Sequence, residues 1–218
     1  MPVTLDTSGS SLQTATATLT VALTIASNAV LLAIIGGKNT GHSVSAVDLG
    51  GVPLTRLGLV GTSDPGGHIE IWGLTAPAAG AGTLRAIMGF STGETWVMTG
   101  ASFLGVAGIN PFSPVQTATT SAITVTMSLS TSNTDMVVVG YSCIQGTSAA
   151  NITTILTTNT YWGFRSGYTA AAATTTSLSA ILQGATTFNW ATAAVSLRFS
   201  AAAASGATPS MCLLGVGF

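Results

Sequence analysis

Apolar and polar side chains alternate with a period of two along several segments of this chain. In residues 14–25 (TATATLTVALTI), Ala and aliphatic residues at odd positions alternate with Thr at most even positions. Residues 123–129 and 193–199 repeat this alternation. Because successive side chains of a strand point to opposite faces, the pattern predicts strands with one buried face. Thr suits the outer face, since β-branched residues favour the pleated backbone.

Further strands are predicted between clusters of Gly, Pro, Asp and Asn that mark turns. They cover residues 28–36, 43–49, 53–60, 68–75, 83–90, 96–105, 135–143, 153–164, 175–183 and 211–217. About a dozen short strands with this punctuation predict an all-β fold, an antiparallel β-sandwich of the jelly-roll kind. Helices in the Ala-rich pieces 169–173 and 201–204 are the alternative, disfavoured because the pieces are short and flanked by Thr, Ser or Gly.

We expect a single β-sandwich domain over residues 1–218. The turn cluster at 108–114 is the best candidate for a weak division, although it also fits an ordinary crossover between two sheets, which is the favoured interpretation. No strict internal repeat is visible. A chain of 218 residues can bury a sizeable core without disulfides.

Charged residues are scarce, and this narrows the classes of function. The chain has five Lys and Arg, six Asp and Glu, and a net charge of −1, whereas about a quarter of an ordinary domain is charged. Proteins that bind nucleic acid show clustered Lys and Arg, so we expect no nucleic-acid partner. A net charge near zero favours association with other protein subunits.

We expect neither a membrane span nor a cleaved secretory signal. The most apolar window, AVLLAIIG at 29–36, is far shorter than the roughly 20 residues of a membrane-spanning helix. The start, MPVTLDTSGS, has neither a basic nor an apolar region of a secretory signal. Cys143 and Cys212 both lie in apolar runs and are predicted as buried thiols, and whether they pair is left open.

Candidate catalytic groups do not gather at the spacing that chemistry requires. His68, Glu70 and Trp72 share one face of a predicted strand, which we interpret as a polar outer face. There is no G-x-S-x-G elbow, no carboxylate pair on one strand face, no phosphate loop and no metal-ligand spacing. We therefore expect no enzyme, no catalytic residue, no metal and no cofactor.

Aromatic residues concentrate at 161–168 (YWGFRSGY). In a strand, Trp162 and Phe164 share one face, and the simplest interpretation places both in the core with Tyr161 and Arg165 at the surface.

The functional alternative is a contact site. Tyr, Trp and Arg dominate protein interfaces, and aromatic rings also stack on sugars. The candidate binding residues, for an interface or a glycan, are Tyr161, Arg165, Tyr168 and Trp72.

The stretch from Asn28 to Val106 carries motifs in a familiar order. These are the hairpin GGVPLT at 50–55, the strand and turn IWGLTAPAAG at 71–80, and the strand SFLG at 102–105. In this order they resemble a β-sandwich module that recurs in virion proteins of tailed bacteriophages and in bacterial surface proteins. The rest of the chain, ending in VSLRF at 195–199, fits the closing strands of such a sandwich, so the resemblance covers nearly the whole chain.

The resemblance implies a non-enzymatic structural protein of a phage virion. The leading hypothesis is a capsid decoration (cement) protein that is assembled in the host cytoplasm and binds other copies of itself and a neighbouring virion protein, such as the major capsid protein. The first alternative is a receptor- or glycan-binding fibre or adhesin module. The second is a self-assembling fibre or sheath subunit, because 14–25 has no charge, Pro or Gly to protect a sheet edge.

Overall fold

The structure is a computed structural model that contains only strands as regular elements in its described part. That part comprises residues 2–14, 17–38, 43–61, 67–89, 95–107, 112, 115–122, 124–143, 147–150, 152–159, 163–171, 174–182 and 188–200. All strand pairs are antiparallel, in four open sheets. The predicted all-β, sandwich-type fold is confirmed.

The first nine strands form two sheets, which we call N-inner (order β1-β9-β3-β7-β6) and N-outer (order β2-β8-β4-β5). Their bounds are β1 Thr4–Thr14, β2 Thr18–Ile25, β3 Val30–Lys38, β4 Val44–Leu49, β5 Val52–Pro53, β6 Thr55–Gly61, β7 Gly67–Thr75, β8 Gly80–Met88 and β9 Thr95–Leu104.

The remaining strands form two more sheets, C-inner (order β10-β17-β12-β15-β14) and C-outer (order β11-β16-β13). Their bounds are β10 Gln116–Ala122, β11 Thr124–Ser130, β12 Met136–Cys143, β13 Thr147–Ala150, β14 Thr153–Asn159, β15 Gly163–Ala170, β16 Thr175–Leu182 and β17 Phe188–Leu197. The candidate division at 108–114 falls between the two sets and lies mostly outside the described residues.

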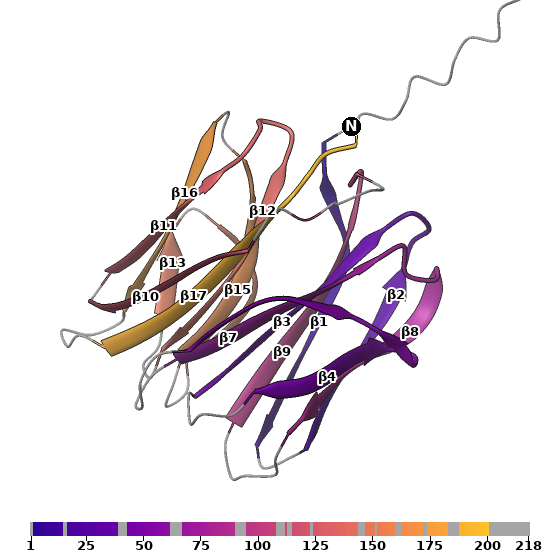
Figure 1. Ribbon diagram of the computed structural model, residues 1–218, viewed down its shortest axis with the longest axis horizontal. Helices are drawn as coiled ribbons and strands as arrows, with labels where there is room; N and C mark the ends of the chain where they lie inside the picture. Colours follow the sequence, from indigo (N-terminus) through magenta and orange to yellow (C-terminus); the bar gives the residue numbers. More distant parts are fainter. Residues whose placement is uncertain are drawn as a thin grey trace, which may run out of the picture.

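The four sheets stack as layers in the order N-outer, N-inner, C-inner, C-outer (Figure 1). Three hydrophobic clusters fill the three spaces between the layers. The inner sheets are therefore covered on both faces, which explains why β3 and β12 are buried along almost their whole length. The outer sheets have one covered face, and their strands β2 and β11 show the predicted alternation of exposed Thr or Ser with buried aliphatic residues.

The chain uses one topology twice, although no strict repeat is visible in its sequence. The strand order β1-β9-β3-β7-β6 in N-inner corresponds strand by strand to β10-β17-β12-β15-β14 in C-inner. The order β2-β8-β4 in N-outer corresponds in the same way to β11-β16-β13 in C-outer. Each half of the chain is thus a two-sheet sandwich, and the two sandwiches pack through their inner sheets (Figure 1).

The correspondence extends to the pairing register. Thr18 pairs with Ile87 in the first half, and Thr124 pairs with Ile181 in the second. The edge strands β6 and β14 each carry one register shift, between Arg56 and Gly58 and between Thr154 and Leu156, at matching positions. Because β-bulges are specific local features of a strand pair, a shared position supports a real structural repeat.

The two sandwiches meet at a close approach between equivalent residues. Ile34 and Gly140 occupy the same position of β3 and β12, and a Cβ on Gly140 would lie 2.6 Å from Ile34 Cγ2. The buried hydroxyls of Thr99 and Ser166 are 2.8 Å apart across the same space. A large side chain on one strand thus fills the space that a glycine leaves on the other.

Most predicted strands are present, with differences at polar or interrupted segments, and the predicted strand at 211–217 lies outside the described residues. The predicted strand 153–164 is two antiparallel strands, β14 and β15. The alternation in 14–25 belongs to β2 only from Thr18, and β1, β10 and β13 were not predicted. These three strands consist mainly of Thr, Ser, Ala, Gly and Gln, so they lack a clear apolar face.

Candidate functional site

Glu70 on β7 is a fully buried carboxylate with several donors around it. The backbone N–H of Val44 donates to Oε1 at 2.7 Å, and Trp72 Nε1 donates to Oε2 at 3.0 Å. His68 Nε2 lies 3.0 Å from Oε1, and Arg56 Nη1 lies 3.8 Å from Oε2. The side chain therefore ties β4 of the outer sheet to β7 of the inner sheet.

This arrangement corrects the interpretation of His68, Glu70 and Trp72 as a polar outer face. The three side chains do share one face, but that face is buried, with His68 3% and Trp72 7% exposed. The reason is the N-outer sheet, which covers β7, and Trp72 joins its hydrophobic cluster. A charged side chain can stay in such a place when hydrogen bonds satisfy it.

The Glu70 carboxylate holds strands together through hydrogen bonds from Val44 and Trp72, and we call this group the Glu70 clamp. Both carboxylate oxygens already accept hydrogen bonds, and the His68 ring packs edge-on to Trp96 with centroids 5.2 Å apart. Among the described residues, no group of three or more His, Cys, Asp or Glu side chains could hold a metal ion.

Two other carboxylates brace equivalent turns in the two sandwiches, the turns that join outer strand β2 to inner strand β3 and outer strand β11 to inner strand β12. Asp6 Oδ2 accepts hydrogen bonds from the N–H of Ala26 at 2.9 Å and from Ser102 Oγ at 2.7 Å. Asp135 Oδ2 accepts from the N–H of Ser132 at 3.0 Å and from Ser196 Oγ at 3.3 Å.

The amide and the serine are at corresponding positions in both cases, as the strand registers show. The carboxylate reaches them from β1 in one sandwich and from the turn itself in the other. The same clamp is therefore made twice from different places in the sequence.

The candidate binding residues are not brought together. Trp72 is buried under the N-outer sheet, where Arg56 lies over its ring with 5.6 Å between the guanidinium carbon and the ring centroid. Arg165 and Tyr168 lie on opposite faces of β15: Tyr168 packs edge-on to Phe103 of N-inner, and Arg165 faces the C-outer side. Tyr161 lies outside the described residues. Phe164 is fully buried between the inner sheets, as expected.

Arg165 belongs instead to a row of polar side chains that runs across neighbouring strands of the C-inner sheet. It pairs across the sheet with Tyr141, which in turn pairs with Thr192. Burial raises the pKa of Tyr141 above its ordinary value of 10.0, against a smaller lowering by Arg165. Burial likewise lowers the pKa of Arg165, and Tyr141 partly offsets this. The hydroxyls of Tyr141 and Thr192 are buried without a hydrogen-bond partner in the described part.

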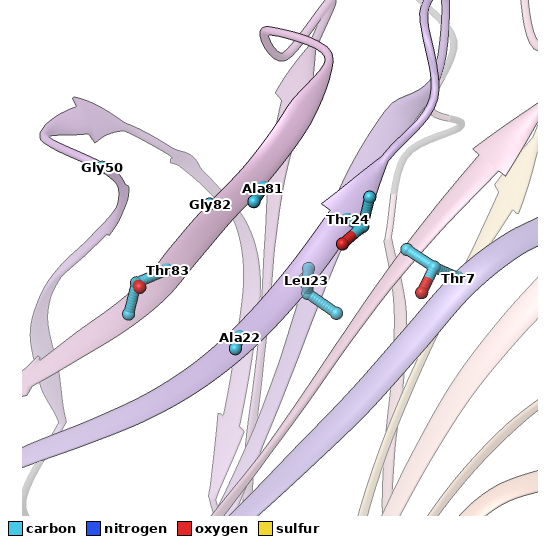
Figure 2. A pocket seen from close by; sticks show the side chains of 8 residues that line it. All are labelled: Thr7, Ala22, Leu23, Thr24, Gly50, Ala81, Gly82 and Thr83. Atoms are coloured by element: carbon cyan, nitrogen blue, oxygen red, sulfur yellow. The ribbon is translucent and has the colours of Figure 1, made fainter.

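A depression of about 620 Å³ lies on the N-outer sheet (Figure 2). Its walls are strands β2 and β8, and it extends to β1 and to the turn at Gly50. The lining residues are uncharged, and all except Leu23 are small: Thr7, Ala22, Leu23, Thr24, Gly50, Ala81, Gly82 and Thr83. Where β2 and β8 carry Ala22, Ala81 and Gly82, the corresponding positions of β11 and β16 carry Ser128, Thr175 and Thr176.

The outer face of the C-outer sheet has no charged side chain among its described residues. Its exposed residues on β11 are Thr124, Thr126, Ser128 and Ser130, and those on β16 are Thr175, Ser177 and Ile181. Ser128 and Ser177 hydroxyls lie 3.2 Å apart, so the face is a cross-strand array of hydroxyls.

On the N-outer sheet, Arg85 is charged, and its guanidinium is bonded to Asp48 at 2.9 Å. Both outer layers therefore present hydroxyls, apolar groups that include the exposed Val52 and Ile181, and at most a paired charge.

Sequence reasoning missed the Glu70 clamp and the two turn clamps. The signal for the first was present, since a Glu between two Ile in a strand is unusual in a chain with so few charges. Asp6 carried no such signal, because Ala26 and Ser102 are distant from it in the sequence. Asp135 is close to Ser132 but distant from its other partner, Ser196, so the clamp between them could not be seen in the sequence. Cys143 is buried, as predicted, and Cys212 lies outside the described residues.

No protein-family model, no curated protein and no solved structure matches this chain. Within the described residues, no helix is long and apolar enough to cross a membrane.

Proposed function

We propose that this chain is a non-enzymatic structural protein that binds neighbouring protein subunits in a phage particle, as a capsid decoration protein. The single observation that carries the proposal is the chemistry of the two outer layers. They display Thr, Ser and Ala on regular strands, and the one charged side chain on β8 is paired. The setting, a virion of a tailed phage, is what the motifs at 50–55, 71–80 and 102–105 imply by resemblance.

The use of the carboxylates supports a structural role. Asp6, Asp48, Glu70 and Asp135 each accept hydrogen bonds from the chain's own backbone or side chains. Removing a charge from water is costly unless it is paired, so these groups are suited to hold strands together. A surface without charged side chains avoids the free-energy cost of desolvating ionic groups when it binds another protein.

Cryo-electron microscopy of particles purified from the source of this sequence tests the proposal. We expect density for the four-layer stack against the capsid surface, with an outer sheet facing a neighbouring subunit. Particles that lack the chain altogether would contradict the proposal.

A glycan array with the full chain tests the adhesin alternative. The proposal predicts no saccharide binding above background, because Trp72, Arg165 and Tyr168 lie in three separate environments. Clear binding of a defined saccharide would instead favour the receptor-binding function.

A further inference from the structure

We propose that the depression on the N-outer sheet binds a segment of this same chain, the apolar residues 211–218, which we call the 211–218 segment. Binding of this kind belongs to the free chain and does not depend on the proposed function. Three features support it: the shape and lining of the depression, the place in the fold where the described chain ends, and the composition of the residues that follow.

The depression is a hollow at positions where the second half of the chain carries larger side chains. Its volume of about 620 Å³ lies within the roughly 300–1,000 Å³ of protein sites that enclose a ligand. Ala81 and Gly82 on β8 correspond to Thr175 and Thr176 on β16. No charged side chain lines the depression (Figure 2), so it suits an uncharged, apolar occupant.

The described chain reaches Ser200 at the same end of the N-sandwich as the depression. The N–H of Ser200 donates to the carbonyl of Gly105 at 2.9 Å, directly after the end of β9. Thr7, which lines the depression, pairs with Ser102 of β9. From Gly105 to Ser102 the strand runs about 10 Å, and the neighbouring sheet layer lies about 10 Å away. Residues 201–210 can span up to about 33 Å when extended, so the 211–218 segment can reach the depression.

The residues that follow Ser200 are uncharged and include an apolar stretch. Residues 201–218 read AAAASGATPSMCLLGVGF, without Asp, Glu, Lys or Arg. Burial of the Met, Leu, Val and Phe side chains against an uncharged surface is favourable. Because the segment belongs to the same chain, its effective concentration at the depression is on the order of millimolar. The 211–218 segment is therefore the occupant that these features favour.

The test uses Cys212 to report where the 211–218 segment lies. In the full chain, Thr24→Cys places a second reporter at an exposed position of the depression. Disulfide formation under mild oxidation is followed by mass spectrometry of the linked peptides. The matched control is Ser130→Cys, at the corresponding exposed position of β11. We expect the bond from position 24 to form at least about tenfold faster than the bond from position 130, because docking raises the effective concentration of Cys212 there.

The control position also lies close to the end of the described chain. The turn after Ser130 contains Asp135, and the N–H of Phe199 donates to Asp135 Oδ1 at 3.2 Å. A segment that is merely tethered at Ser200 would therefore reach position 130 at least as readily as position 24.

A second pair of variants fills the site in the Thr24→Cys chain. Ala22→Trp places a large side chain in the depression, so we expect the disulfide to slow to the rate of the Ser130→Cys control. Ser128→Trp, at the corresponding exposed position of β11, is expected to leave the rate unchanged. Circular dichroism confirms that each variant is folded.

A fast bond within one molecule between positions 24 and 212, slowed by Ala22→Trp alone, supports the proposal. Equal rates at positions 24 and 130 overturn it, because tethering then explains both bonds. Disulfide-linked dimers also overturn it, since the occupant is then the segment of a second copy. A bond between Cys143 and Cys212 overturns it as well, because the segment then lies away from the depression.

Discussion

At the scale of single residues, the few charged and buried polar groups stabilise the fold. Glu70 accepts hydrogen bonds from Val44 and Trp72 with no exposure to solvent. Loss of the carboxylate leaves these donors unsatisfied in an apolar space. Glu70→Ala is expected to lower the free energy of unfolding by about 3 kcal/mol, measured by chemical denaturation.

The control for this change is Ser45→Ala. The hydroxyl of Ser45 is exposed and donates one hydrogen bond to the carbonyl of Ile87, so the loss is expected to be within about 0.5 kcal/mol. Equal effects of the two substitutions would show that Glu70 is not a buried clamp.

Tyr141 predicts how stability depends on alkaline pH. Burial raises the pKa of its hydroxyl in the folded state above the ordinary value of 10.0, which the unfolded chain keeps. The folded state thus holds this proton more tightly, and the associated stability is present below pH 10 and is lost as the pH rises above it. Burial also lowers the pKa of Arg165 in the folded state. In the unfolded chain Arg165 stays charged until about pH 12, so it adds no change of unfolded-state charge between pH 10 and that value.

We expect the wild type to lose stability between pH 10 and 11.5 and Tyr141→Phe to lose less. Phe also removes a buried hydroxyl without a partner, so at pH 7 the variant is expected to be at least as stable as the wild type. Thermal melting at pH 7, 10 and 11 measures both effects. Parallel pH profiles of the two proteins would refute this role of Tyr141.

At the scale of elements, the turns that join β2 to β3 and β11 to β12 depend on carboxylate clamps that the repeat makes in different ways. Asp6→Ala removes acceptors for Ala26 and Ser102, and Asp135→Ala removes acceptors for Ser132 and Ser196. Each substitution is expected to cost about 1–3 kcal/mol of unfolding free energy. Ser45→Ala, which removes an exposed hydrogen bond to Ile87, is the control and should stay within about 0.5 kcal/mol. Similar values for all three variants would argue against the clamps.

The strands themselves were largely predictable from the sequence, because β2, β11 and β17 carry the alternation or aliphatic runs that a sheet requires. The stacking of the sheets could not be predicted in this way. Strands β3 and β12 lack alternation because both of their faces are covered, and a continuous apolar run does not say what covers it.

The structural repeat could not be predicted from the sequence either, because corresponding positions share burial and strand pairing more than residue identity. Glu70 and Arg165 illustrate this: they occupy matching places of β7 and β15 but carry opposite charges. The misreading of His68, Glu70 and Trp72 has the same origin, because polarity predicted exposure where a second sheet gives burial.

At the scale of the whole molecule, the facing inner sheets of the two sandwiches have complementary shapes where β3 packs on β12. Gly140→Val places a branched side chain against Ile34 and is expected to cost about 1–3 kcal/mol by overpacking. Adding Ile34→Ala opens space at the same point, so the double variant is expected to be more stable than the sum of the single effects predicts. Chemical denaturation of the four proteins gives the coupling, and strict additivity would contradict the packing of β3 on β12.

The scarcity of charge links the scales, because the clamps use the charges internally and the outer layers are left with hydroxyls and apolar groups. We therefore expect contacts between this chain and neighbouring subunits that do not depend on ionic attraction. The most direct measurement is the fraction of the chain that stays bound in its native particles at about 0.1 M and about 1 M salt, where the screening length falls from about 10 Å to about 3 Å. We expect the same bound fraction at both concentrations. Release of the chain at the higher salt would contradict it.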